Sequence, residues 1–285
     1  MNLCFFVSDL HGRTGRYLSL FAAIRKDKPD IVLLGGDLLP HGFGLKSGFS
    51  DFYNDFLVKQ FRQLREELHD EYPQVLLILG NDDPRIHEEN FIKESESGLW
   101  TYLHNRRIDT GNYVFYGYAN VPPTPFRLKD WERYDVSRYV DPGCMAPTEG
   151  IHTVDPGIDL EYATIQDDLQ KLAGSDDLSK SVFLFHSPPY KTCLDRAALD
   201  GQSIDHVPLD VHVGSIAIQR FIEERQPLAT LHGHIHESSR ITGCWKQKMG
   251  QTVVMTAAWD GQELALVRFD LADPGSAARE LIGQE

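Results

Sequence analysis

Short apolar runs alternate with amphipathic stretches along most of the chain. Strand-like apolar runs occupy residues 3–7, 30–37, 74–80, 181–187, 227–236, 252–259 and 263–270. Stretches with apolar side chains at helical spacing occupy residues 14–28, 51–70, 165–172 and 213–225. Because strands and helices of these lengths alternate, the pattern predicts an α/β fold with parallel strands joined by right-handed crossovers.

Two regions depart from this alternation. The last two runs, 252–259 and 263–270, follow each other closely and predict a closing pair of strands. Residues 120–158 are rich in proline and aromatic residues and show no clear period. We expect this segment to be an ordered insertion over the sheet edge, with aromatic side chains such as Trp131 able to stack on a ligand. Residues 1–285 are expected to form one domain.

Composition narrows the range of partners. The formal net charge is -14 at pH 7, whereas non-specific binding to nucleic acid needs a basic surface, so polymeric nucleic acid is not an expected partner. No apolar run approaches the roughly 20 residues of a membrane span, and the first residues lack the basic start of a secretion signal. We therefore expect a cytoplasmic protein without a membrane partner. Its oligomeric state is left open.

The cysteines do not form a recognisable motif. Cys4, Cys144, Cys193 and Cys244 are scattered without close spacing. They therefore indicate neither a disulfide framework nor a thiolate metal site.

Polar side chains suited to metal binding follow five of the predicted strands. They are Asp9 and His11, Asp37, Asn81, His186, and His234 with His236. Because ligands of open α/β sheets bind at the carboxyl ends of strands, we expect these side chains to share one edge. Carboxylate, carboxamide and imidazole groups are the donor set of ions such as Mn²⁺, Fe, Zn²⁺ and Ni²⁺. The set exceeds what one ion needs and suits two divalent ions that share a bridging carboxylate.

The order of these motifs resembles that of the calcineurin-like metallophosphoesterases, which carry D-x-H, G-D, G-N-H, H and G-H-x-H. Here the series reads "DLH" at 9–11, "GD" at 36–37, "GND" at 80–82, the single His186 and "GHIH" at 233–236. The resemblance implies a two-sheet β-sandwich flanked by helices, in four α-β-β-α layers. It also implies that Asp9, His11 and His236 hold one metal, that Asn81, His186 and His234 hold a second, and that Asp37 bridges them. Mn²⁺ is the preferred ion.

The third motif departs from the family pattern. Asp82 stands where the family usually has a histidine, which is thought to donate a proton to the leaving group or to hold a phosphoryl oxygen. A carboxylate beside two cations is expected to stay ionised and to be a poor proton donor. The role of Asp82 as a catalytic residue is therefore open. Asp83 and Pro84 are interpreted as the N-cap and first-turn proline of a helix.

Other polar residues near the motifs are weaker candidates. Arg13 and Arg85 follow ligand motifs directly and are candidate phosphate clamps, although a solvated loop arginine is an equally good interpretation of each. The histidines outside the motifs, among them His41, His152, His206 and His212, are interpreted as surface or substrate-side residues rather than metal ligands.

These features predict a metal-dependent hydrolase of phosphoric esters. Two bridged cations lower the pKa of a shared water, so a metal-bridging hydroxide is the expected nucleophile. A small phosphodiester is preferred as substrate, because the absence of the histidine acid favours better leaving groups. The alternatives are a phosphomonoesterase or protein phosphatase of the same fold, and a metal-poor binding scaffold. A nuclease is a further alternative, but it would need a basic surface.

Overall fold

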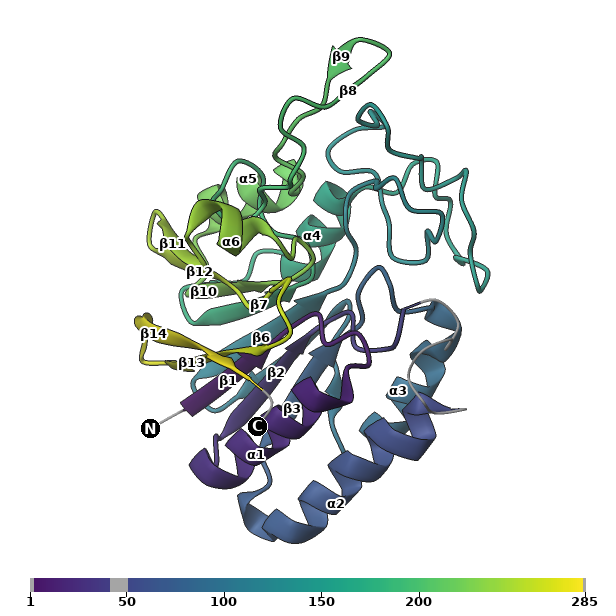
Figure 1. Ribbon diagram of the computed structural model, residues 1–285. Coiled ribbons are helices and arrows are strands. Elements are labelled where there is room, and N and C mark those ends of the chain that lie inside the picture. Colours follow the sequence, from purple (N-terminus) through teal and green to yellow (C-terminus); the bar gives the residue numbers. More distant parts are fainter. Residues whose placement is uncertain (1–2, 42–50, 284–285) are drawn as a thin grey trace.

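Two six-stranded β-sheets pack face to face in the computed structural model, which describes residues 3–41 and 51–283 (Figure 1). The first sheet contains, in spatial order, β14 (Asp273–Ile282), β13 (Leu264–Asp270), β1 (Leu3–Val7), β2 (Ile31–Gly35), β3 (Gln74–Ile78) and β4 (Thr101–Tyr102). The second contains β11 (Lys246–Met249), β12 (Thr252–Thr256), β10 (Ala229–His232), β7 (Ser181–Phe185), β6 (Tyr113–Tyr118) and β5 (Arg106–Thr110). The predicted two-sheet sandwich is confirmed.

Helices cover the outer face of each sheet, which gives the four expected layers (Figure 1). The first sheet carries α1 (Thr14–Asp27), a π-helix (Tyr53–Val58) that continues into α2 (Lys59–Leu68), and α3 (Glu88–Glu96). The second carries α4 (Ile165–Ala173) and α5 (Ile216–Arg225). Short elements complete the fold: 3₁₀ turns at His69–Glu71 and Arg85–His87, α6 (Ser238–Thr242), and the hairpin of β8 (Ser203–Ile204) and β9 (Val207–Pro208). None of the helices in the described residues is long and apolar enough to span a bilayer.

Alternation along the strands divides the buried side chains between two hydrophobic clusters. In β7, Val182 and Leu184 point into the space between the sheets, whereas Phe183 and Phe185 pack with α4 and α5. This follows from the period of two in a strand, which sends successive side chains to opposite faces. Strands buried on both faces explain why the sequence shows continuous apolar runs rather than alternation of apolar and polar residues.

The helices over the second sheet begin at polar caps. The side chain of Thr164 accepts a hydrogen bond from the backbone N–H of Asp167 at the start of α4, at 3.1 Å. Ser215 accepts one from the N–H of Ile218 at the start of α5, at 3.0 Å. Each cap satisfies one of the backbone donors that a helix leaves unpaired in its first turn.

The predicted closing pair of strands is wrong. β12 lies in the second sheet, parallel to β10, whereas β13 lies in the first sheet, antiparallel to β1. The chain therefore crosses from one sheet to the other between them, and β13 pairs instead with the edge strand β14. Hydrophobic runs predict that strands exist, but they do not tell which sheet each strand joins. β14 itself, "DPGSAARELI", has too few apolar residues to be recognised as a strand.

The insertion that links β6 to α4 is anchored by buried polar contacts. The Lys129 ammonium donates hydrogen bonds to Glu132 at 2.6 Å and to the carbonyl oxygen of Thr124 at 2.7 Å, and both charged side chains are 0% exposed. Trp131 is also buried, and its Nε1–H donates to the carbonyl oxygen of Asp83 at 2.7 Å. The expectation that Trp131 stacks on a ligand is therefore wrong, because its ring is part of the packing beneath the insertion.

One disulfide joins Cys193 to Cys244, whose Cα atoms are 5.9 Å apart. It links the segment after β7 to the segment after α6. This pairing could not be predicted, because the two cysteines are 51 residues apart and form no spacing motif. Cys4 and Cys144 take no part in this disulfide.

Replacement of Lys129 by methionine should destabilise the protein. The substitution removes the only cation of a fully buried pair and leaves Glu132 without its partner, which typically costs about 3–5 kcal/mol of unfolding free energy. Urea and thermal unfolding of K129M measure this cost, and K171M, at an exposed lysine of α4, is the control. If K129M unfolds like K171M, the buried pair does not hold the insertion.

Candidate metal centre

The polar residues predicted to be metal ligands meet where the strands of both sheets end. Asp9 and His11 follow β1, Asp37 follows β2, and Asn81 follows β3, all in the first sheet. His186 follows β7, and His234 and His236 follow β10, in the second sheet. The expected common edge is thus formed by two sheets rather than by one.

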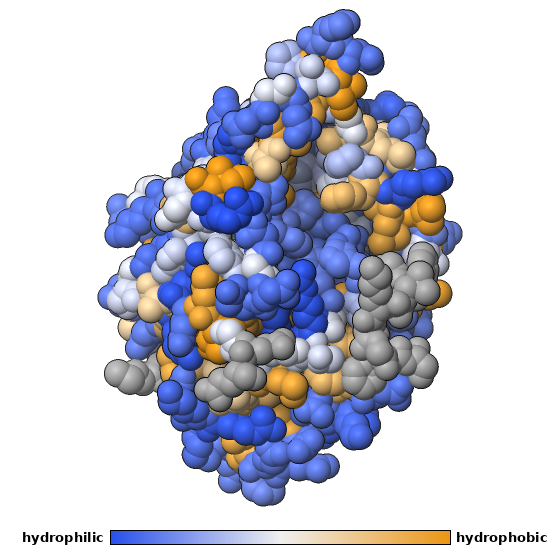
Figure 2. All heavy atoms as spheres, viewed as in Figure 1, coloured by the Kyte–Doolittle hydropathy of each residue, from blue (hydrophilic) through white to orange (hydrophobic). Residues whose placement is uncertain are grey.

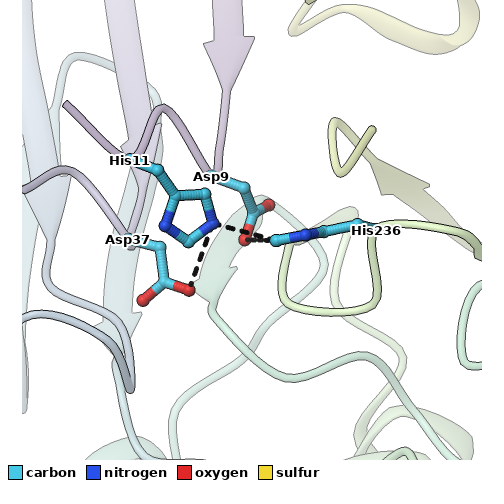
Figure 3. A group of neighbouring side chains, drawn as sticks. All are labelled: Asp9, His11, Asp37 and His236. Carbon is cyan, nitrogen blue, oxygen red and sulfur yellow. Dashed lines mark hydrogen bonds and ion pairs between the residues drawn. The ribbon is translucent and has the colours of Figure 1, made fainter. Parts of the chain in front are cut away.

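Four of these side chains form one group, shown in Figure 3: Asp9, His11, Asp37 and His236. One ligand atom from each lies within 4.8 Å of those of the others. Nε2 of His11 is 3.0 Å from Nε2 of His236 and 3.8 Å from Oδ2 of Asp37. Nε2 of His236 is 3.3 Å from Oδ1 of Asp9. Two carboxylates and two imidazoles therefore point at one another.

A second group shares Asp37 with the first. Nε2 of His186 is 3.3 Å from Oδ2 of Asp37 and 3.0 Å from Oδ1 of Asn81. The ring of His234 lies beside that of His186, with 5.2 Å between the ring centroids. The same oxygen of Asp37 thus faces a histidine of each group, His11 on one side and His186 on the other.

Several of these residues need an unusual backbone conformation to point inward. Asp9, His11, Asp37 and His234 have φ angles of 56°, 47°, 52° and 73°. This left-handed region is disfavoured for side chains other than glycine, although asparagine, aspartate and histidine adopt it more often than most. Such strain persists where the surrounding structure enforces it and is concentrated at functional sites.

Glycines beside the ligands provide space that no side chain could share. A Cβ on Gly80 would lie 2.3 Å from Oδ1 of Asp37 and 2.7 Å from Cε1 of His186. A Cβ on Gly36, where φ is +93°, would lie 2.7 Å from Nδ1 of His186. Gly36 and Gly80 are therefore required by close approach to the candidate ligands.

Two buried residues that the sequence did not single out as site residues hold the loops in place. Arg16 of α1 donates hydrogen bonds to the carbonyl oxygens of Asp9 at 2.6 Å and of Gly261 at 2.7 Å. Asp83 accepts from the backbone N–H groups of Leu38, Leu39 and Gly80 at 2.7 to 3.0 Å. The N-cap interpretation of Asp83 is wrong, since its carboxylate ties the loop after β2 to the loop after β3. Its distant partners could not be read from the sequence.

Comparison with known proteins identifies the family. A family model described as calcineurin-like phosphoesterase matches residues 4–238. The chain belongs to the calcineurin-like phosphoesterase family. TT1561 of Thermus thermophilus is similar in fold, with a TM-score of 0.55, 16% identity and 99% of each chain covered. A dimetal phosphatase from Danio rerio has a TM-score of 0.52 and 12% identity, with 99% of this chain and 96% of that chain covered. Comparison with curated proteins finds no significant match.

Charge is concentrated in the centre of this phosphoesterase. Burial alone would raise the pKa of the Asp37 carboxyl and lower that of the His186 imidazole, but each is opposed by the other's charge. As a result the pKa of Asp37 is held below its usual range, and the pKa of His186 lies above its ordinary value. Burial likewise opposes ionisation of Asp9, yet the hydrogen bond from His236 and the nearby positive charge keep its pKa low. Both carboxylates are therefore ionised at neutral pH.

Two histidines remain neutral. Burial lowers the pKa of His11 to about 4, and burial with the adjacent charge of His186 lowers that of His234 to about 4. A neutral imidazole has a lone pair that can bind a metal ion. His11 and His234 are thus neutral imidazoles beside two ionised carboxylates, a protonation state in which they can bind a metal ion. The carboxylates of Asp37 and Asp9 instead raise the pKa of His186 and of His236.

The hydrogen bonding of these side chains fits divalent ions. Nδ1 of His186 is 2.8 Å from the carbonyl oxygen of Gly35, so Nδ1 carries a hydrogen. The other ring nitrogen, Nε2, lies near Oδ1 of Asn81 and Oδ2 of Asp37, which are both hydrogen-bond acceptors. Oδ2 of Asp9 and Nδ1 of His11 are buried without a hydrogen-bond partner. Buried polar atoms are rarely left in this state. By contrast, both ring nitrogens of the neighbouring His232 have protein partners, at 2.8 Å each.

The other candidate residues lie around this group. Nδ1 of His41 is 2.7 Å from Oδ2 of Asp82. The Arg13 guanidinium donates to the carbonyl oxygen of Gly261, and that of Arg85 pairs with Glu88. In the described part of the chain, no hydrogen bond or ion pair joins either guanidinium to the ligands. The role of these arginines as phosphate clamps stays a prediction.

Divalent ions should stabilise this phosphoesterase against heat. Binding to the folded state alone adds about 2.7 kcal/mol at an ion concentration 100 times the dissociation constant. Mn²⁺ added to chelator-treated protein should therefore raise its Tm in a thermal scan, and H236A should shift less because it removes one donor. The matched control is H206A, at an exposed histidine of the β8–β9 turn, which should shift like the wild type. An equal shift in H236A would exclude His236 as a ligand.

Proposed function

We propose that this chain hydrolyses phosphoric esters with the aid of two divalent metal ions, and that a small phosphodiester is its substrate. The observation that carries the proposal is the position of Asp37. Its Oδ2 atom is 3.8 Å from Nε2 of His11 and 3.3 Å from Nε2 of His186. One buried carboxylate oxygen between two sets of nitrogen and oxygen donors has the arrangement of a ligand shared by two ions.

The ligand sets follow from the two groups of side chains. Asp9, His11 and His236 would hold one ion, with Asp37 shared. Asn81, His186 and His234 would hold the other. The absence of thiolates from both sets favours Mn²⁺, Fe, Zn²⁺ or Ni²⁺, with Mn²⁺ as the first candidate. The similar fold of a protein described as a dimetal phosphatase is in keeping with two ions.

The bound ions would lower the pKa of a water between them and neutralise the charge on the phosphoryl oxygens. The chain's own residues supply the orientation that this chemistry needs. The N–H of Asp82 donates to Oδ1 of Asp37 at 2.9 Å, which holds that carboxylate with Oδ2 towards both histidines. The hydrogen bond from His186 to the Gly35 carbonyl fixes its ring in the same way. Fixed ligand orientation is a contribution that the protein makes at such sites.

Charge at the site favours a diester over a monoester. The side chain of Asp82 is 29% exposed next to the metal ligands, and the whole chain has a formal charge of -14. A phosphodiester carries one negative charge, whereas a monoester carries nearly two at neutral pH, so the diester meets less repulsion. One alternative is a phosphomonoesterase or protein phosphatase, which a preference for monoesters would reveal. The other is a metal-poor scaffold, which would bind no divalent ion.

The insertion presents apolar side chains to solvent. Phe126, Ile151 and Ile158 are 54%, 50% and 50% exposed. Figure 2 shows orange spheres at the upper right, where the loops of the insertion lie in Figure 1. With Trp131 buried, Phe126 is the better candidate to contact an aryl or base group of the substrate. We further propose that residues 1–285 form one domain and that the protein is cytoplasmic.

The Mn²⁺-loaded protein should hydrolyse bis-p-nitrophenyl phosphate faster than p-nitrophenyl phosphate. D37A should lose about two or more orders of magnitude in kcat, because both ions depend on this carboxylate. Release of p-nitrophenol measures both reactions, and circular dichroism checks that the variant is folded. Faster hydrolysis of the monoester would favour the phosphomonoesterase alternative, and wild-type turnover in folded D37A would contradict the shared-ligand model.

Elemental analysis should find about two Mn²⁺ ions per wild-type chain and about one in N81A. Asn81 contributes to only one of the two proposed ligand sets, so the other ion should remain. N112A, at an exposed asparagine between β5 and β6, is the control and should retain both ions. A folded wild-type protein that binds no divalent ion would support the scaffold alternative instead.

A further inference from the structure

His41 lies at the mouth of the proposed centre and contacts two of its residues. Its ring is stacked on that of His11, with 3.9 Å between the centroids and 15° between the planes. Its Nδ1 atom is 2.7 Å from Oδ2 of Asp82. The three side chains come from the loops after β1, β2 and β3, so the contact depends on the fold and has no signature in the sequence.

Exposure increases from the ligands towards His41. The side chain of His11 is 2% exposed, that of Asp82 is 29% exposed and that of His41 is 57% exposed. His41 thus forms the outer layer of this part of the centre, where an ester arriving from solvent would first meet the protein. The ring stack and the hydrogen bond together restrict the orientation of this exposed side chain.

The contact with Asp82 fixes how the imidazole is presented. The oxygen of a carboxylate accepts hydrogen bonds, so Nδ1 of His41 is the donor. The stack on His11 sets the plane of the ring, and the bond to Asp82 sets its rotation. Nε2 is then the remaining polar atom of the ring. Within residues 3–41 and 51–283, the structure shows no protein hydrogen bond to it.

The negative charge of Asp82 explains why the position of His41 matters for an anionic ligand. The Asp82 carboxylate adds negative charge at the entrance to a site that must admit an anion, and like charges repel strongly where solvent is partly excluded. His41 donates a hydrogen bond to one oxygen of that carboxylate, and its own ring is more exposed to solvent than the carboxylate is. The pair can therefore offer a polar contact to an anionic ligand where Asp82 alone would oppose it.

We propose that His41 is a substrate-binding residue, whose Nε2 hydrogen-bonds an oxygen of the phosphoryl group while Asp82 and His11 position the ring. This inference rests on the proposed function, since it concerns the ligand of that same site. It assigns a role to Asp82 as well: the carboxylate is a positioning residue that acts through His41. His41 is not a metal ligand in this scheme.

The test is binding of inorganic phosphate to the Mn²⁺-loaded protein, measured by isothermal titration calorimetry. H41A should bind phosphate about tenfold more weakly, which corresponds to the loss of one hydrogen bond to a charged group. H41Q should stay within about threefold of the wild type, because its amide can also donate. In H41A/D82N, removal of the exposed carboxylate charge should restore part of the affinity that H41A loses.

Metal content and kinetics distinguish phosphate binding by His41 from metal binding or simple packing. Metal content should be unchanged in H41A, and its KM for bis-p-nitrophenyl phosphate should rise more than its kcat falls. H206A is the matched control and should bind phosphate like the wild type. Wild-type phosphate affinity in H41A, equal losses in H41A and H41Q, or loss of an ion from H41A would each overturn the inference while leaving the proposed function in place. A wild-type protein that neither binds phosphate nor hydrolyses esters would overturn the proposed function itself.

Discussion

The position of Asp37 is the constraint on which the centre depends. Its side chain is only 3% exposed, yet it carries a negative charge and faces histidines from both sheets. A buried charge is tolerated only where other charges or hydrogen bonds compensate for its lost hydration. The glycines, the left-handed backbone at four candidate ligands and the network of Asp83 all serve to bring that compensation within reach. The ion pair of Asp37 with His186 therefore joins the two sheets electrostatically at the ends of β2 and β7.

The convergence of the candidate ligands could be predicted from the sequence because each one follows an apolar run. A strand determines where its carboxyl end lies, so Asp9 and His186 could be placed at an edge without knowing any contact. Arg16 and His41 could not be found in this way. Arg16 is one charged residue on a helix, and nothing in its spacing tells that its guanidinium joins the carbonyl of Asp9 to that of the distant Gly261. His41 becomes significant only through Asp82, which follows a different strand.

In the fold, too, features set by a local sequence pattern were predictable, whereas features set by long-range contacts were not. Buried strands and amphipathic helices were predictable because their pattern is local. β14 was not, since an edge strand needs few apolar residues, and the separation of β12 from β13 into two sheets is a matter of topology. Asp83 illustrates the point on a smaller scale. The residue was recognised as structural, but two of its three partners, Leu38 and Leu39, lie in a loop that only the folded chain brings near it.

The disulfide between Cys193 and Cys244 encloses a segment that contains α5, β10, His234 and His236. Its ends are 51 residues apart in sequence, and a covalent loop of that length lowers the conformational entropy of the unfolded chain by an amount equivalent to about 4 kcal/mol. The histidines that the second sheet contributes after β10 are therefore held by a bond that thiol reductants can break. The resistance to unfolding of the segment that carries His234 and His236 thus depends on whether Cys193 and Cys244 are oxidised. A chain produced with reduced cysteines lacks the stabilisation that the disulfide provides.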